Sequence, residues 1–455
     1  MTATSADTMR TRSDLFGHPR ALTFLFATEK WERFSFYGMR ALLVLYMIKY
    51  LLPPPQADAV VGLGALKHAL EFVIGPLELQ PLASQIYGCY TGFVYLTPIF
   101  GGLLADRVLG RRRTVILGAA LMAVGHFMMA FEHLFLLALT VLILGNGCFK
   151  PNISTQVGFL YAPGDRRRDR AFSIFYVGIN LGAFLAPLVC GTLGEELGWH
   201  YGFAAAGVGM TIGLITYLCA TSSLPPEERV RQPVAQQPPI GRAGWRAIAA
   251  LFVLFLPASL YWGTYEQQGN TIPLWASQFT DRHLFGAFEI PVTWFQAFNP
   301  FMIFAFTPFI VALWRRQGRR EPSTVAKMSI GCFLSAAAWL IMLAAAQVAG
   351  EGQASWLWLF AFFVVLTAGE LYLSPTSLSL ITKVAPARVL SMMMGVWLGT
   401  YFVGGFLGGY LGTYWSSMSK PDFFVMMAAI SATAGLAIAL LVRPLRDMLR
   451  EDVAI

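Results

Sequence analysis

Long apolar runs recur along the whole chain, separated by short polar segments that hold most of the charged residues. Each run is close to the roughly 20 residues that an α-helix needs to cross a bilayer. The pattern therefore predicts twelve membrane-spanning helices, at 21–50, 82–105, 114–131, 134–160, 171–195, 201–221, 246–279, 292–314, 324–346, 354–384, 389–415 and 422–443. Because several runs exceed the minimum length, we expect tilted or kinked helices. Internal prolines predict the bends, since proline removes a backbone donor; they are Pro98, Pro187, Pro257, Pro308 and Pro375.

Composition supports an all-α integral membrane protein. Of the 455 residues, 56% are hydrophobic and 13% are charged, whereas soluble domains carry about 25% charged residues. The polar start leads directly into a long apolar run without a small-residue cleavage site, so we expect no cleavable signal peptide. The long first loop, 53–80, contains a stretch at 66–72 that we expect to form an interfacial helix.

The basic residues predict the orientation. With twelve spans, the termini and every second loop lie on one side, and that side carries 25 of the 33 Lys and Arg residues; the opposite loops carry four. This bias predicts cytoplasmic termini. The net charge of +8 is then a topology signal, so we expect no nucleic-acid partner. Basic clusters at helix ends, such as 111–113 and 166–168, are placed to contact lipid phosphates.

The longest polar, proline-rich stretch divides the chain into two halves of six spans. We therefore expect a cytoplasmic N-terminus at 1–20, a six-helix bundle at 21–221, a cytoplasmic linker at 222–244, a second bundle at 245–443 and a cytoplasmic C-terminus at 444–455. An Arg-x-x-Gly-Arg-Arg motif, each time preceded by a Thr-Pro pair, follows both the second and the eighth span, which supports an internal duplication.

Charged residues inside the apolar runs are the main candidates for function. The first run contains Glu29, Glu32 and Arg33, and the fourth contains Lys150. An ionised group at the membrane centre costs about 2.5–3.5 kcal/mol on insertion scales, so these groups must recover that cost. Glu29 and Arg33 are four residues apart and share a helix face. The cluster indicates either a functional site or a static ion-pair lock between helices.

Other chemistry finds little support in the sequence. The five cysteines lie in spans without C-x-x-C spacing, and the six histidines are not spaced as metal ligands. We therefore expect no metal site and no cofactor. No nucleophile motif such as G-x-S-x-G is present, so there are no candidate catalytic residues and an intramembrane enzyme is disfavoured.

The loop after the second span resembles the loop motif of the major facilitator superfamily. It carries two glycines at 101 and 102, then Asp106, Arg107, Gly110 and three arginines. Glycines permit close helix contact, and Asp106 can pair with the arginines at a helix end. The resemblance implies two six-helix bundles.

Five further motifs resemble the proton-dependent oligopeptide transporter family, a branch of that superfamily, in the order in which that family has them. They are Glu29-x-x-Glu32-Arg33-Phe34, Phe149-Lys150-Pro151-Asn152, Phe175-Tyr176-x-x-Ile179-Asn180-x-Gly182, Tyr265-Glu266-Gln267-Gln268-Gly269 and Gly369-Glu370-Leu371-Tyr372-Leu373-Ser374-Pro375. The resemblance implies a bacterial-type symporter that imports di- and tripeptides by alternating access, with protons as the coupling ion.

A peptide is a zwitterion, so its site needs cations for one end, a carboxylate for the other and amides for the backbone. The resemblance implies these substrate-binding residues: Arg33, Tyr37, Tyr90, Lys150, Asn180, Asn299, Glu370 and Trp397. For the aromatic residues and the asparagines, ordinary packing is an equally good interpretation, because Trp and Tyr are common in spans.

Proton coupling needs carboxylates whose protonation can change, and Glu29, Glu32 and Glu266 are the candidates. By the resemblance, Arg40 and Glu266 are expected to pair as an extracellular gate. Three features depart from the family: the linker is too short for the two extra helices of many bacterial members, Phe36 replaces a tyrosine, and the second span lacks the histidine of animal members.

Rival functions stay open at this stage. They are proton-coupled transport of another small solute, such as nitrate, an amino acid or a drug-like molecule, and a nutrient sensor that does not transport. We expect a monomer in contact with membrane lipid, in the inner membrane of a bacterium.

Overall fold

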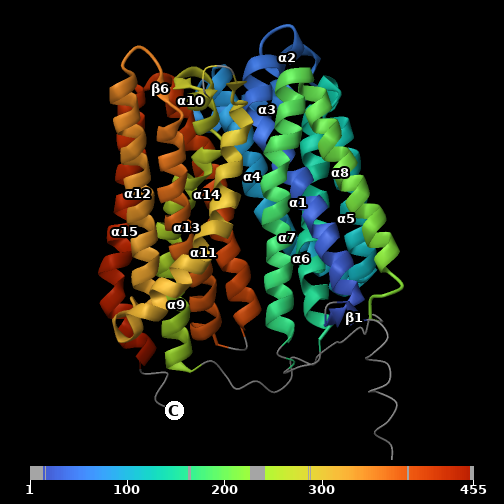
Figure 1. Ribbon diagram of the computed structural model, residues 1–455, viewed down its shortest axis with the longest axis vertical. Helices are drawn as coiled ribbons and strands as arrows, with labels where there is room; N and C mark the ends of the chain where they lie inside the picture. Colours follow the sequence, from blue (N-terminus) through green and yellow to red (C-terminus); the bar gives the residue numbers. More distant parts are fainter. Residues whose placement is uncertain are drawn as a thin grey trace, which may run out of the picture. The chain divides into compact units, whose positions relative to one another are not determined.

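The computed structural model describes residues 14–15, 17–161, 165, 167–225, 241–284, 286, 288–386 and 389–450. The predicted polar segments at 1–13, 226–240 and 451–455, and Arg166 of the basic cluster, lie outside the described residues. The described part is almost entirely helical (Figure 1).

The chain forms two compact units. The first comprises Met1–Leu42 and Thr97–Arg231, and the second comprises Leu43–Leu96 and Gln232–Ile455. Helices α1 and α4 are each divided between the two units, so that one part of each helix belongs to the first unit and the other part to the second. The division of the chain into two bundles at 222–244 stays a prediction.

The first unit consists of helices and one short antiparallel hairpin, β1–β2, in which Leu15 pairs with His18. Its elements are β1 Asp14–Leu15, β2 His18–Pro19, most of α1 Arg20–Tyr46, the end of α4 Leu79–Leu104, η2 Ala105–Leu109, α5 Arg111–Met128, η3 Glu132–Leu134, α6 Phe135–Phe159, α7 Arg167–Ala186, η4 Pro187–Gly191, η5 Leu193–Leu197 and α8 Trp199–Ala220. Within it, α5 packs between α6 and α8.

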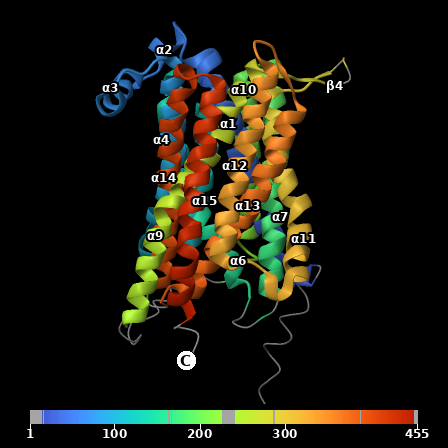
Figure 2. The same cartoon turned by 90° about the vertical axis from the view of Figure 1, so that its left-hand side faces the viewer.

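The second unit contains the other long helices and two further pairs of two-residue strands. Its elements are η1 Met47–Leu51, α2 Gln56–Ala59, α3 Leu63–Ile74, most of α4, α9 Arg242–Tyr265, η6 Glu266–Gln268, α10 Ile272–Gln278, β3 Thr280–Asp281, β4 His283–Leu284, β5 Phe288–Glu289, η7 Val292–Ala297, α11 Phe298–Gln317, η8 Gly318–Arg320, α12 Thr324–Ala349, β6 Ala354–Ser355, α13 Leu357–Val384, α14 Leu390–Ser417 and α15 Lys420–Arg450. In Figure 2, α9, α14 and α15 run side by side.

The twelve predicted spans are confirmed. Eleven helical segments of the described chain are long and apolar enough to cross a membrane. The twelfth is α5, which begins with Arg111, Arg112 and Arg113 and therefore has a low mean hydropathy despite its apolar remainder. Only residues 221–241 connect α8 to α9, whereas two more spans would need about 40 residues. The fold thus has twelve long helices, without two extra spans between α8 and α9.

Two expected elements differ in detail from the structure. The predicted helix at 66–72 is present and longer, as α3 Leu63–Ile74. The seventh span, predicted as one helix over 246–279, is broken by the 3₁₀ turn Glu266–Gln268. The break is stabilised because the side chain of Gln267 donates to the Gly408 carbonyl of α14 at 2.7 Å and that of Asn270 donates to the same oxygen at 3.3 Å.

A glycine contact joins α4 to α6 in the first unit. A Cβ atom at Gly101 would lie 1.9 Å from the carbonyl oxygen of Gly147. That carbonyl is four residues before Pro151, which has no N–H to bond it. The amide of Asn152 donates to the Gly101 carbonyl at 3.3 Å. The Lys-Pro-Asn segment of α6 therefore shapes a contact that only glycine permits.

Replacing Gly101 with alanine should destabilise the first unit, because the added methyl group would overlap with the α6 backbone. Overpacking of this kind costs about 1–3 kcal/mol. The matched control is Gly102→Ala, since a Cβ there meets nothing within 4 Å. Thermal unfolding of both variants in detergent measures the difference. Equal melting temperatures would contradict the expected role of Gly101.

Candidate functional site

The site in the first unit is centred on an ion pair inside α1. Glu29, Glu32 and Arg33 are all buried. The Arg33 guanidinium binds Glu32 with two nitrogens: Nη2 donates to Oε1 at 2.7 Å, and Nε donates to Oε2. This two-point geometry is the strongest way for a guanidinium to bind a carboxylate. Glu32 is thus the main counter-ion of Arg33.

Glu29 is less completely compensated. Its Oε1 lies 3.5 Å from Arg33 Nε, across one helical turn. Its other oxygen, Oε2, is buried and has no hydrogen-bond partner among the described residues. A buried carboxylate oxygen without a donor costs free energy, and binding a proton lowers that cost because it removes the charge. Glu29 is therefore the carboxylate of this cluster best placed to change its protonation state.

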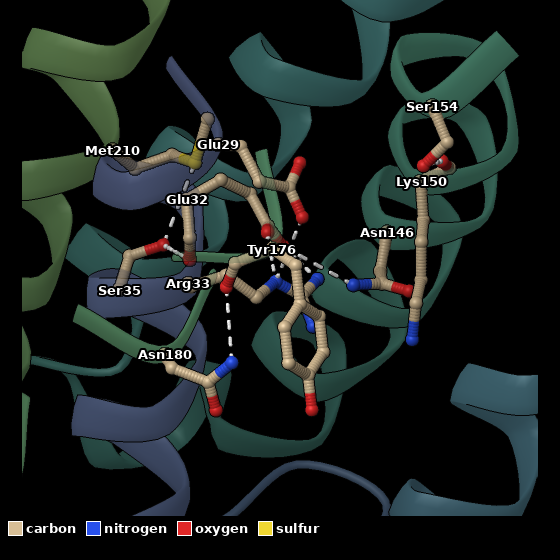
Figure 3. A network of polar contacts seen from close by, with 10 residues as sticks. All are labelled: Glu29, Glu32, Arg33, Ser35, Asn146, Lys150, Ser154, Tyr176, Asn180 and Met210. Carbon is tan, nitrogen blue, oxygen red and sulfur yellow. Dashed lines mark hydrogen bonds and ion pairs between the residues drawn. The ribbon is translucent and has the colours of Figure 1, made fainter. Parts of the chain in front are cut away.

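Helix α6 adds polar groups to the cluster. The side chain of Asn146 donates to Glu32 Oε1 at 3.3 Å. Lys150 follows one turn later on the same face, and Figure 3 shows both side chains beside the α1 charges. Lys150 interacts electrostatically with Glu29, Glu32, Arg33 and Arg40. The structure thus brings the predicted charges of the first and fourth spans together.

Phe36 has a role that the sequence interpretation missed. The Arg33 guanidinium carbon lies 5.0 Å from the centre of the Phe36 ring, in cation–π contact. The ring of Phe36 in turn meets Tyr37 edge to face, with centroids 5.2 Å apart. Phe36 lacks the hydroxyl expected in many members of the family. Its ring instead supports the charge of Arg33.

Helix α7 brings Asn180 next to α1. A Cβ atom at Gly182 would lie 2.2 Å from the Lys30 carbonyl oxygen, so the motif glycine permits close approach of the two helices. The side-chain amide of Asn180 donates to the Tyr176 carbonyl at 3.0 Å (Figure 3). The asparagine is therefore fixed on its own helix, beside the α1 charges.

The second unit holds the other predicted carboxylate, Glu370 on α13. The amide nitrogen of Asn299, on α11, donates to Glu370 Oε2 at 2.8 Å and to Thr367 Oγ1 at 3.1 Å. Two predicted site residues, far apart in the sequence, are thus in direct contact. Because both contacts use the Asn299 nitrogen, this residue orients Glu370 and its N–H groups are not free for a peptide unit.

The second unit also holds the buried aromatic residues of the predicted site. Trp397 is buried, and its indole N–H has no hydrogen-bond partner in the described part of the chain. Tyr90, on α4, is also buried. Trp262 stacks on Tyr401, with centroids 4.0 Å apart. Aromatic side chains suit ligands with variable apolar groups where they line a pocket.

Glu266 lies in the 3₁₀ turn that ends α9 and is buried. The hydroxyl of Tyr87, on α4, donates to its Oε2 at 3.1 Å. Arg40 is buried in the first unit. The pairing of Arg40 with Glu266 stays a prediction from the sequence.

Two contact residues were not identified from the sequence. Asn146 precedes Lys150 by four residues, so the helical period was the available signal. Tyr87 precedes Tyr90 by three residues, but α4 contains several aromatic residues and nothing in the sequence distinguishes this one. A polar partner on a different helix is visible only in the structure.

The fold and the buried charges define a membrane transporter of the major facilitator type. Comparison with known proteins supports this class. The model of the POT family matches residues 112–241 and 242–426. A di-/tripeptide transporter of Lactococcus lactis subsp. cremoris is 32% identical, with 97% of this chain and 98% of the relative covered. Peptide transporter YePEPT of Yersinia enterocolitica is 34% identical, with 84% of this chain and 85% of the relative covered.

A solved structure agrees with these matches. A mutant of peptide transporter POT, solved in complex with alafosfalin, is 29% identical; the match covers 96% of each chain and has a TM-score of 0.83. The chain therefore belongs to the POT family, and the resemblance drawn from its five motifs is confirmed.

The two acids of α1 should differ in their effect on stability. Glu32→Gln would leave Arg33 without its main counter-ion, and breaking a buried pair typically costs about 3–5 kcal/mol. Glu29→Gln should cost clearly less, because Glu32 still binds Arg33 at two points. Thermal unfolding in detergent measures both variants, with Glu351→Gln, exposed in the turn after α12, as the control. A Glu29 variant as unstable as the Glu32 variant would contradict this assignment.

Proposed function

We propose that this protein is a proton-coupled symporter that imports di- and tripeptides by alternating access. The observation that carries the proposal is the cluster of the buried Glu29, Glu32 and Arg33 with the half-buried Lys150, in which one carboxylate oxygen of Glu29 has no described partner. Such a cluster supplies a cation for a substrate carboxylate and an acid that can take up a proton. The relatives named as peptide transporters support the choice of substrate.

Each unit supplies one kind of recognition group. Arg33 and Lys150 of the first unit bind the substrate carboxylate, and Glu370 of the second unit binds the amino group. Asn180 serves the peptide unit, Asn299 holds Glu370 in place, and pocket walls come from Tyr37, Tyr90 and Trp397. The carboxylate end of a peptide is negative and matches the cations Arg33 and Lys150. Its amino end is positive and matches Glu370.

The proton is carried by acids of both units. In the first unit, protonation of Glu29 would weaken its attraction to Arg33, leaving the guanidinium more available to a substrate carboxylate, while Glu32 retains its two-point contact. In the second unit, Glu266 is proposed to respond to protonation and to form the extracellular gate with Arg40.

The membrane orientation is also part of the proposal. The excess of Lys and Arg on one side supports cytoplasmic termini. Because the matched relatives come from bacteria, we place the protein in a bacterial inner membrane, where a proton gradient can drive uptake.

Uptake by proteoliposomes tests the function. Purified protein should accumulate a labelled dipeptide only under an inward proton gradient, and excess unlabelled dipeptide should compete where nitrate does not. Lys150→Ala removes the cation of the fourth span and should abolish this uptake. The control is Lys30→Ala, whose amine lies over Trp31 at 4.4 Å, outside the cluster. Uptake that does not depend on the proton gradient, or normal uptake by Lys150→Ala, would contradict the proposal.

Substrate analogues test the role of Glu370. A hydrogen bond to a charged group contributes about 1.5–3 kcal/mol, so Glu370→Gln should weaken dipeptide binding roughly 10- to 100-fold. Dipeptides with an acetylated amino group should bind both proteins with similar, low affinity. Competition against a labelled dipeptide measures the effect. An equal loss for blocked and free peptides would show that Glu370 does not bind the amino group.

A further inference from the structure

Helix α3 exposes an apolar face and partly buries its charged side chains, which is the reverse of a helix on a water-facing surface. Its exposed face carries Gly64, Ala65, His68, Ala69, Phe72 and Val73. Phe72 is 92% exposed and Val73 is 79% exposed. A helix on a water-facing surface turns its polar side outward. The exposed face of α3 therefore suits an apolar environment.

The charged residues of α3, Lys67 and Glu71, lie outside this face and are partly buried. Lys67 Nζ lies 3.7 Å from Glu71 Oε1, one turn along the helix. Glu71 also accepts a hydrogen bond from the Leu77 backbone N–H at 3.0 Å, which ties α3 to the start of α4. Lys67 lines a cavity of about 560 Å³ together with Asp58 and Glu78. The polar face of α3 thus has partners within its own unit.

The position of α3 in the chain keeps it at a membrane surface. It lies between the spanning segments Arg20–Leu51 and Leu79–Leu109. Only residues 75–78 separate α3 from α4, and four residues extend at most about 14 Å. Figure 2 shows α3 standing away from α4 and α14, at the end of α4. The exposed face is therefore within reach of the bilayer.

The spanning helices of the same unit expose apolar side chains for the same reason. Leu256 of α9 and Leu440 of α15 are 66% and 70% exposed, because lipid covers them in the membrane. We propose that α3 is an in-plane anchor whose Phe72 and Val73 insert into the phospholipid leaflet on the side opposite the termini. In such anchors the apolar face enters the boundary between headgroups and acyl chains by about 5–10 Å.

Spin labels test the position of α3 independently of transport. Nitroxides are placed at Phe72→Cys, Val73→Cys and, as a water-facing control, Asp58→Cys, in protein whose five native cysteines are replaced. The protein is reconstituted in phosphatidylethanolamine–phosphatidylglycerol vesicles. The ratio of oxygen to nickel-chelate collision rates should be several-fold higher at 72 and 73 than at 58. Introducing Phe72→Asp should lower the ratio at 73 toward that of the control.

Each alternative gives a different result. Labels at 72 and 73 as accessible to nickel as position 58 would overturn the proposal. Spin–spin broadening at 72 would do the same, because it would indicate a second copy of the chain on this face. If the cysteine-free protein does not fold, Phe72→Trp in the native background is used instead. Its added fluorescence should be quenched by lipids brominated near the headgroup, and that of Asp58→Trp should not. Equal quenching of the two would again contradict the anchor.

Discussion

A buried guanidinium is the constraint on which the functional part of the first unit depends. Arg33 sits inside a spanning helix, where an uncompensated charge is expensive. Its surroundings are built to compensate it: Glu32 binds it at two points, Glu29 lies across one turn, and Phe36 covers it with a ring face. Asn146 then fixes Glu32 from α6. Since the Asn146 contact joins this compensated charge to α6, the cluster links α1 and α6.

The same compensation leaves room for chemistry. A site in which all acids were fully satisfied would be a static lock, as the sequence alone allowed. Here Glu32 satisfies Arg33 and Glu29 keeps an oxygen without a described partner. The two acids, three residues apart, thus differ in how far the described residues compensate them, and the proposed proton site is the less compensated one. In the second unit, Asn299 and Glu370 form a simpler arrangement in which an amide orients one carboxylate.

Close backbone contacts at glycine bring these groups within reach of one another. Gly182 lets α7 approach α1, and Gly101 lets α4 approach α6. In the second unit, a Cβ at Gly88 of α4 would lie 2.6 Å from the Cα of Gly409 on α14. Spanning helices gain little from hydrophobic association in lipid, so small residues and interhelical hydrogen bonds determine their packing. The motif glycines are thus part of the site, although they carry no functional group.

The sequence alone determined the class of the protein, its twelve spans, its family and most of the charged residues that the structure brings together. These follow from local properties of the sequence. The length of each apolar run indicates a spanning helix, and the four-residue spacing of Glu29 and Arg33 indicates that they share a helix face. Tertiary structure decided which acid binds Arg33 most closely, because Glu32 and Arg33 project about 100° apart on a helix and meet only when their long side chains bend together. It also decided that Asn299 serves Glu370, that Asn146 and Tyr87 take part, and that the seventh span breaks at Glu266–Gln268. Apart from the Glu32–Arg33 pair within α1, each of these depends on a partner from another helix, and no spacing within one segment of sequence contains that information.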